Sequence, residues 1–227
     1  MSENLRAQTI SRGQSVEMDD NARRVLRNTW NLLALTLLFS AGTAALSMVN
    51  NWPHPGLIIT LVGYFGLLFA TQALRNSAWG IVTTFALTGF MGLTIGPIIN
   101  AYTTMFSNGS EIVMAAMGTT GVAFIGLSGF AMVTKKDFSF MGPMLFAGIL
   151  VAFIAGLAAY IFSMPALSLA VSGMFALLMC GLILYQTQQI VRGGETNYIM
   201  ATVTLFVSIY NLFLSLLHLL GFFFGEE

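Results

Sequence analysis

The residues best suited to chemistry lie near the C-terminus, where small polar side chains recur within an apolar segment. Steps of four, three, four and three residues place them on one face of a helix. This polar stripe comprises Thr204, Ser208, Asn211, Ser215 and His218. A polar stripe on a membrane helix should face other helices or water rather than lipid. Two interpretations stay open: hydrogen bonds between helices, which the absence of a carboxylate favours, or the lining of a polar path.

His218 could sense protons, because imidazole titrates near neutral pH. A neutral histidine bonded to a neighbouring helix is the favoured interpretation, since burial disfavours the charged form. The other histidine, His54, is expected on a solvated loop, and Cys180 has no second cysteine with which to pair. These residues form no metal-ligand cluster, so the sequence predicts neither a metal site nor another cofactor.

One pattern is typical of an enzyme. Gly126-Leu127-Ser128-Gly129 resembles the GxSG serine motif of rhomboid intramembrane proteases, and His218 is the candidate base. A nucleophilic serine needs a base within hydrogen-bond distance, which a sequence does not establish. Glycine and serine are common in these segments, so a chance match is expected. We therefore predict that the protein is not an enzyme and has no catalytic residues.

Long apolar segments must position these side chains. The 227-residue chain is 56% hydrophobic and 8% charged, whereas soluble domains are about a quarter charged. About 20 apolar residues in a helix span a bilayer, so the sequence predicts an all-α bundle of seven transmembrane helices. The spans are expected at about 28–49, 56–74, 79–104, 111–133, 139–162, 165–190 and 198–224. Gly96 and Pro97 should kink or break the third span.

The positive charges predict the orientation of the bundle. With the N-terminus inside, all nine Lys and Arg residues fall on the inner side, in the tail or in alternate loops. They are Arg6, Arg12, Arg23, Arg24, Arg27, Arg75, Lys135, Lys136 and Arg192. The opposite loops carry none, so the positive-inside rule places the N-terminus in the cytoplasm and the C-terminus outside. The low charge density also argues against a nucleic-acid partner, which needs a clustered basic face.

The chain divides into a tail, residues 1–27, and a membrane domain, residues 28–227. The tail, Met1 to Arg27, is polar and mixed in charge, with few large apolar residues. It cannot bury enough surface to offset its ordering entropy. We therefore expect a flexible cytosolic segment.

Four segments resemble the Bax inhibitor family, in particular its bacterial YccA-like branch. The most specific is GGETNYIMATVTLFVSIYNLFLSLLHLLG at 193–221, and the others are VLRNTW at 25–30, GPIINAY at 96–102 and KKDFSFMG at 135–142. The resemblance implies a seven-helix bundle with the last helix near its centre. It also implies a protein of the bacterial inner membrane that binds and restrains the FtsH protease, engaged through the tail Met1 to Arg27. The regulatory complex of that protease is a further candidate partner, and the oligomeric state stays open.

Other members of this family are pH-sensitive calcium leak channels, which gives an alternative function. Their sensor is a pair of buried aspartates on the last two spans, and the matching positions here are Gln186 and Ser208. Two close carboxylates can share a proton and so act as a pH switch, but neither residue here can ionise. The arginine latch of the family also has no counterpart inside the second span, because Arg75 lies at its edge. A calcium or cation leak is therefore expected to lack the pH switch.

Overall fold

The computed structural model describes residues 19–226, which form seven α-helices and no β-strand. Each helix is long and apolar enough to cross a membrane. The helices are α2 (Asp20–Val49), α3 (Leu57–Leu74), α4 (Trp79–Met105), α5 (Gly109–Val133), α6 (Met141–Ile161), α7 (Pro165–Val191) and α8 (Tyr198–Phe224). The prediction of an all-α membrane protein with seven spans is confirmed for this part of the chain.

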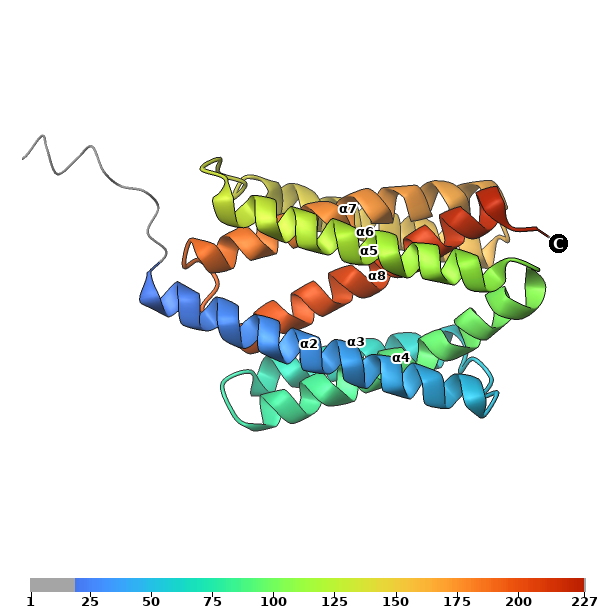
Figure 1. Ribbon diagram of the computed structural model, residues 1–227, viewed down its shortest axis with the longest axis horizontal. Coiled ribbons are helices and arrows are strands. Elements are labelled where there is room, and N and C mark those ends of the chain that lie inside the picture. Colours follow the sequence, from blue (N-terminus) through green and yellow to red (C-terminus); the bar gives the residue numbers. More distant parts are fainter. Residues whose placement is uncertain (1–18, 227) are drawn as a thin grey trace, which may run out of the picture.

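The last helix lies between two groups of helices (Figure 1). On one side α4 packs against α2 and α3, and on the other α7 packs against α5 and α6. Helix α8 contacts α2, α4, α5 and α7, so it joins the two groups. The outer helices, α3 and α6, bury few side chains: Thr71 on α3, and Leu145, Ala152 and Ala159 on α6. Some of their other apolar side chains are partly buried against the core, such as Leu67, whereas others, such as Ile58 and Phe146, are exposed as a lipid-facing surface requires.

The side chains of α8 supply the centre of the core. Phe206 is 1% exposed and packs in a cluster with Leu33 of α2, Leu87 of α4 and Ile190 of α7. Further along α8, Leu217 packs in a second cluster with residues of α2, α4 and α5. Because α8 packs against four helices, none of residues 199–221 is exposed, whereas its last turn, Phe222–Phe224, is exposed.

Glycines bring α2 and α4 close together. A Cβ atom on Gly96 would lie 2.7 Å from the carbonyl oxygen of Ala44, so only glycine allows the two backbones to approach this closely. The Ser47 hydroxyl donates to the Leu93 carbonyl at 3.1 Å across the same contact. Helix α4 continues through Pro97 to Met105, so the predicted break there does not occur.

The first helix begins earlier than predicted. It starts at Asp20 rather than at about 28, and Arg23 and Arg27 therefore lie on helix rather than in a flexible segment. Ala22 and Val25 are buried against the bundle, which gives these first turns apolar contacts that the overall polarity of the tail had concealed. The remaining tail residues, 1–18, lie outside the described residues.

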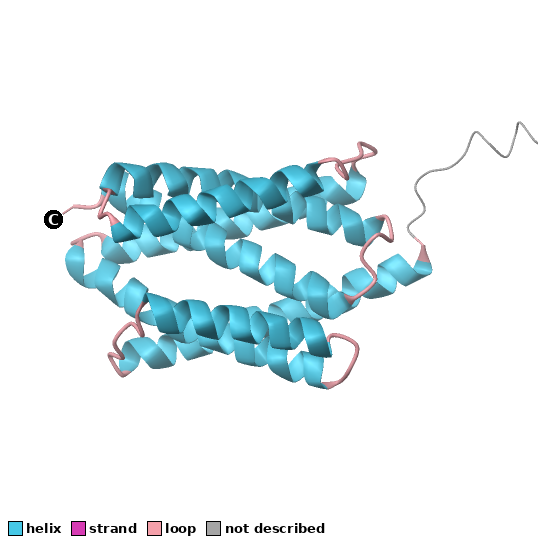
Figure 2. Cartoon of the chain, turned by 180° about the vertical axis from the view of Figure 1, so that it is seen from behind, coloured by secondary structure: helices cyan, strands magenta, loops and turns pink. Residues whose placement is uncertain are grey.

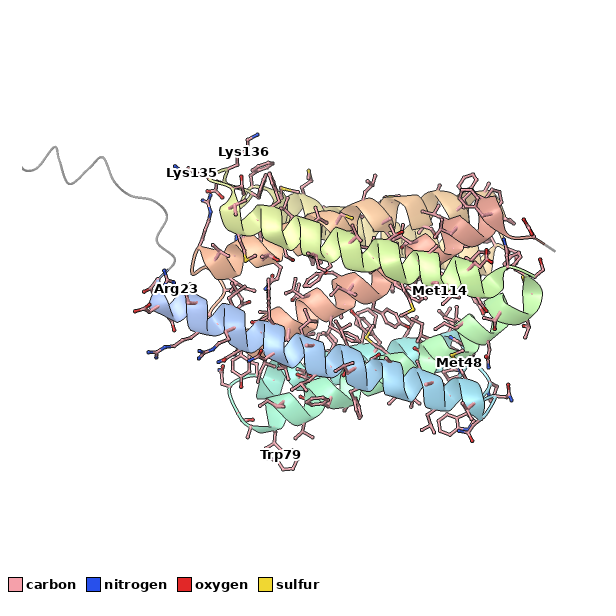
Figure 3. All side chains as sticks on the ribbon, viewed as in Figure 1. Arg23, Met48, Trp79, Met114, Lys135 and Lys136 are labelled. Carbon is pink, nitrogen blue, oxygen red and sulfur yellow. The ribbon has the colours of Figure 1, made fainter. Side chains whose placement is uncertain are left out.

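The positive charges gather at one end of the bundle. Arg23, Lys135 and Lys136 lie together at that end, and Met48 lies toward the other (Figure 3). Since successive helices alternate in direction, the turns with Arg75 and Arg192 lie at the charged end too. The loops at the two ends are visible from behind in Figure 2. Those at the far end, at 50–56, 106–108 and 162–164, carry no Lys or Arg.

Candidate functional site

The last turns of α7 place three consecutive polar side chains inside the bundle, at its charged end. Gln186, Thr187 and Gln188 are all buried. Thr187 pairs with Ser128 of α5, with 3.3 Å between the two hydroxyl oxygens. A polar side chain inside an apolar bundle is costly unless it is hydrogen-bonded, so the partners of the two glutamines indicate what each residue does.

Gln188 ties α7 to the loop between α5 and α6. Its Nε2 donates to the Lys136 carbonyl at 2.6 Å, and its Oε1 accepts from the Phe138 backbone N–H at 2.7 Å. One turn later, Arg192 donates to the same Lys136 carbonyl at 2.7 Å. We call Gln188, Arg192 and residues 135–138 the loop clasp. This contact was not predicted from the sequence, although an amide in an apolar segment close to a charged loop was a usable signal.

The loop clasp includes the one ion pair found within residues 19–226, in which Arg192 Nη1 lies 3.3 Å from Asp137 Oδ2. Hydrogen bonds from Ser139, and then the charge of Arg192, hold the pKa of the Asp137 carboxyl below its usual range. A lowered pKa in the folded state means that this stabilisation is present above the unfolded-state pKa and is lost as the pH falls through the folded-state value. The carboxyl is exposed, so solvent screens the pair, and the Gln188 hydrogen bonds contribute more.

Gln186 has no such partner. Its Nε2 is buried without a hydrogen-bond partner among the described atoms, and so is the hydroxyl of Thr29 on α2. Thr29 lies four residues from both Val25 and Leu33, and Gln186 lies four residues before Ile190. Because Val25, Leu33 and Ile190 share one core cluster, both unpaired groups face the junction of α2, α7 and α8.

Ser208 is fully buried but bonds within its own helix. Its hydroxyl donates to the Thr204 carbonyl at 2.7 Å, and no hydrogen bond joins it to Gln186. Asn211 likewise donates to the Val207 carbonyl at 2.8 Å. These polar groups of the stripe are therefore satisfied locally, and they do not bond to other helices.

His218 is the member of the stripe that bonds to another helix. Its Nδ1 lies 2.6 Å from the hydroxyl of Ser172 on α7. Ser128, the serine of the GxSG motif, instead pairs with Thr187, also on α7. Ser172 and Thr187 are 15 residues apart, or about 22 Å along the helix at 1.5 Å per residue. His218 and Ser128 thus lie at different depths, and the serine–base pair of an intramembrane protease is not formed.

Residues 19–226 contain no cluster of side chains suited to binding a metal ion. No group of three or more His, Cys, Asp or Glu side chains there is placed to hold an ion. The fully buried polar side chains are hydroxyls and amides, which are neutral, and the one imidazole among the groups described above, His218, is half-buried. This end of the bundle can donate and accept hydrogen bonds, and its surface carries positive charge.

The sequence matches known proteins over most of its length. A family model described as "Inhibitor of apoptosis-promoting Bax1" matches residues 22–225. The chain belongs to the Bax inhibitor family. Within that family it is similar to the modulator of FtsH protease YccA of Escherichia coli K12, with 48% identity over 89% of this chain and 91% of that one. The resemblance expected from the 193–221 segment is confirmed.

Two further relatives have similar coverage. An uncharacterized protein of Pseudomonas aeruginosa is 49% identical, over 89% of this chain and 91% of that one. An uncharacterized membrane protein of Vibrio cholerae is 41% identical, over 93% of this chain and 95% of that one. The similarity to these members of the Bax inhibitor family therefore extends over about nine-tenths of this chain.

Proposed function

We propose that this protein binds and restrains a membrane-bound protease of the FtsH type in the bacterial inner membrane. The observation that carries the proposal is the 48% identity, over 89% of the chain, to a relative named as a modulator of FtsH protease. Another E. coli relative of equal identity is named an inner membrane protein, which supports the location. Positive charge at one end of the bundle supports an orientation with the N-terminus in the cytoplasm.

Competition for the protease is the mechanism that fits this fold. The tail, residues 1–18 ahead of α2, would enter the protease as a handle, and α2 would be the first helix to be pulled. Helix α2 is held by its close contact with α4 at Gly96 and by contacts with α7 and α8. The hydroxyl of Thr202 on α8 also donates to the Thr29 carbonyl at 3.3 Å. A protease working against these contacts would stay occupied.

The opposite end of α8 is held as well. Asn108, in the turn between α4 and α5, donates from Nδ2 to the Phe224 carbonyl at 2.7 Å, and its Oδ1 accepts from the Glu226 backbone N–H at 3.2 Å. The backbone N–H of Ser107 donates to the Glu226 carbonyl at 2.9 Å. Because the central helix is fixed at this end, pulling from the N-terminus would not release it early.

Deleting residues 2–18 tests the handle. The helix from Asp20 stays intact, so the protein should insert normally and persist severalfold longer in cells that contain the protease. Pulse–chase labelling measures the lifetime, and protease-deficient cells give the reference. Replacing residues 2–18 by a glycine–serine segment of equal length is the matched control, and it should restore turnover if the protease needs only a flexible end. An unchanged lifetime after the deletion would contradict the handle.

Native co-purification from membranes tests the partner. Full-length protein is expected to recover an FtsH-type protease, and the variant that lacks residues 2–18 should recover less of it. Failure of the full-length chain to recover any such protease would count against the proposed partner.

Ion flux separates this function from a cation leak. The purified protein in liposomes loaded with a calcium indicator is expected to show no flux gated by pH, because Gln186 and Ser208 do not titrate. The double variant Gln186→Asp with Ser208→Asp supplies the comparison, since paired carboxylates share a proton and introduce pH dependence. A strong pH-gated flux through the unmodified protein would favour the leak instead.

A further inference from the structure

The outward face of α2 changes character along its length. Positions three or four residues apart share a helix face. Five such positions are exposed, namely Arg23, Arg27, Asn31, Ala34 and Leu38. The face therefore passes from charged to polar to apolar within about 22 Å of helix. Leu38 is 71% exposed and must face lipid in a membrane-spanning bundle.

Trp30 marks the level of the membrane surface on this helix. Tryptophan is favoured where the hydrocarbon meets the headgroups, and Trp30 is exposed. At 1.5 Å per residue, Arg27 lies about 4.5 Å and Arg23 about 10 Å beyond it along the axis. The headgroup layer is about 5–7 Å thick on each side, so both long side chains can reach it.

The arginines line a shallow hollow of about 300 Å³, together with Leu26, Trp30 and Asn31. A neighbouring hollow shares Arg23 and Arg27 and adds Arg24 and Asp20. The two hollows are thus lined by three guanidinium groups and one carboxylate. The backbone beneath is fixed, because Ala22 and Val25 of the same turns are buried in the bundle.

We propose that Arg23 and Arg27 of α2 bind the phosphate of an anionic phospholipid headgroup. A guanidinium presents a fork of N–H donors that matches phosphate oxygens. One turn after Arg27 along α2, Asn31 adds an amide donor. Trp30 and Leu26 supply apolar contact for the glycerol and upper acyl chain. A lipid fits better than a soluble anion because Asn31, which lines the hollow, lies on the same exposed helix face as Ala34 and the lipid-facing Leu38.

Lipid retention by the purified full-length chain tests this site. Native mass spectrometry would compare nanodiscs of phosphatidylglycerol and phosphatidylcholine. The unmodified protein should retain phosphatidylglycerol in preference, and Arg23→Gln with Arg27→Gln should lower that retention about tenfold. The matched control is Lys135→Gln with Lys136→Gln, which removes the same charge at the same end and should leave retention unchanged. A thermal unfolding curve for each variant shows that it is folded.

Three results would overturn the proposal. Equal loss in both double variants would indicate bulk charge rather than a site. Displacement of the lipid by excess inorganic phosphate, with equal phosphate binding in phosphatidylcholine nanodiscs, would indicate a site for free phosphate. If the arginine variant keeps its lipid but no longer co-purifies with the protease, this face contacts a protein instead. Lipid retention itself, and the first two of these results, do not depend on whether the protein restrains a protease.

Discussion

Gly96→Leu is expected to lower the free energy of unfolding by about 3 kcal/mol or more. Adding methylenes to a packed contact usually costs about 1–3 kcal/mol, and more when the neighbours cannot move. Here the first added carbon would meet the Ala44 carbonyl oxygen at 2.7 Å and the Ser47 Cβ at 2.8 Å. Both atoms belong to or adjoin the backbone of α2, so a leucine must push the whole helix away from α4. Gly92, which faces Ser40 and Thr43, should behave in the same way.

Gly118→Leu on α5 is the matched control for this prediction. No atom lies within 4 Å of a Cβ built there, so the same substitution should change stability by less than about 0.5 kcal/mol. Unfolding by sodium dodecyl sulfate in mixed micelles measures both variants. In cells, Gly96→Leu should also shorten the lifetime if extraction of α2 limits degradation. Equal destabilisation at positions 96 and 118 would show that the α2–α4 contact is not the sensitive one.

Gln188→Met and Gln186→Met are expected to have opposite effects, although the positions are two residues apart. Gln188→Met removes two short hydrogen bonds and leaves the Phe138 N–H without its partner, which should cost about 2 kcal/mol. Gln186→Met instead removes a buried amide that has no partner. Replacing an unsatisfied donor by an apolar group of similar length should raise the free energy of unfolding by about 1 kcal/mol.

Hydrogen exchange gives the local measurement for this pair. In Gln188→Met the amides of residues 135–140 should exchange faster, because the loop clasp loses its link to α7. In Gln186→Met they should keep their rates. If Gln186→Met destabilises the bundle as much as Gln188→Met, the Gln186 amide must have a hydrogen-bond partner, which would contradict this prediction.

Much of the fold could be predicted because lipid imposes simple rules on sequence. The spans follow from apolar length, and the alternation of charged turns follows from the positions of Arg75, Lys135 and Arg192. The start of α2 was missed, since the polarity of its first turns hid the inward spacing of Ala22, Val25 and Thr29. Overall composition reports the average of a helix, whereas burial depends on one face.

The candidate site was less predictable, because spacing defines a face but not its partners. The stripe on α8 could be read from the sequence, yet its bonds depend on how α7 lies against α8. His218 meets Ser172 across that contact, whereas Ser208 bonds within α8. The loop clasp joins Gln188 to residues about 50 positions earlier in the chain, a pairing that follows only from the three-dimensional arrangement.

The central position of α8 has a consequence for how the protein is made. Ribosomes deliver helices in chain order, so α2 to α7 enter the bilayer before the helix that joins their two groups exists. Until Tyr198–Phe224 arrives, Thr94 lacks the Tyr210 hydroxyl at 3.0 Å, and Ser172 lacks His218. Without α8 the two groups contact each other mainly through α4 with α5 and α2 with α7, and the core clusters around Phe206 and Leu217 are incomplete. A chain whose translation ends before α8 would expose this incomplete interface to the quality-control factors of the membrane.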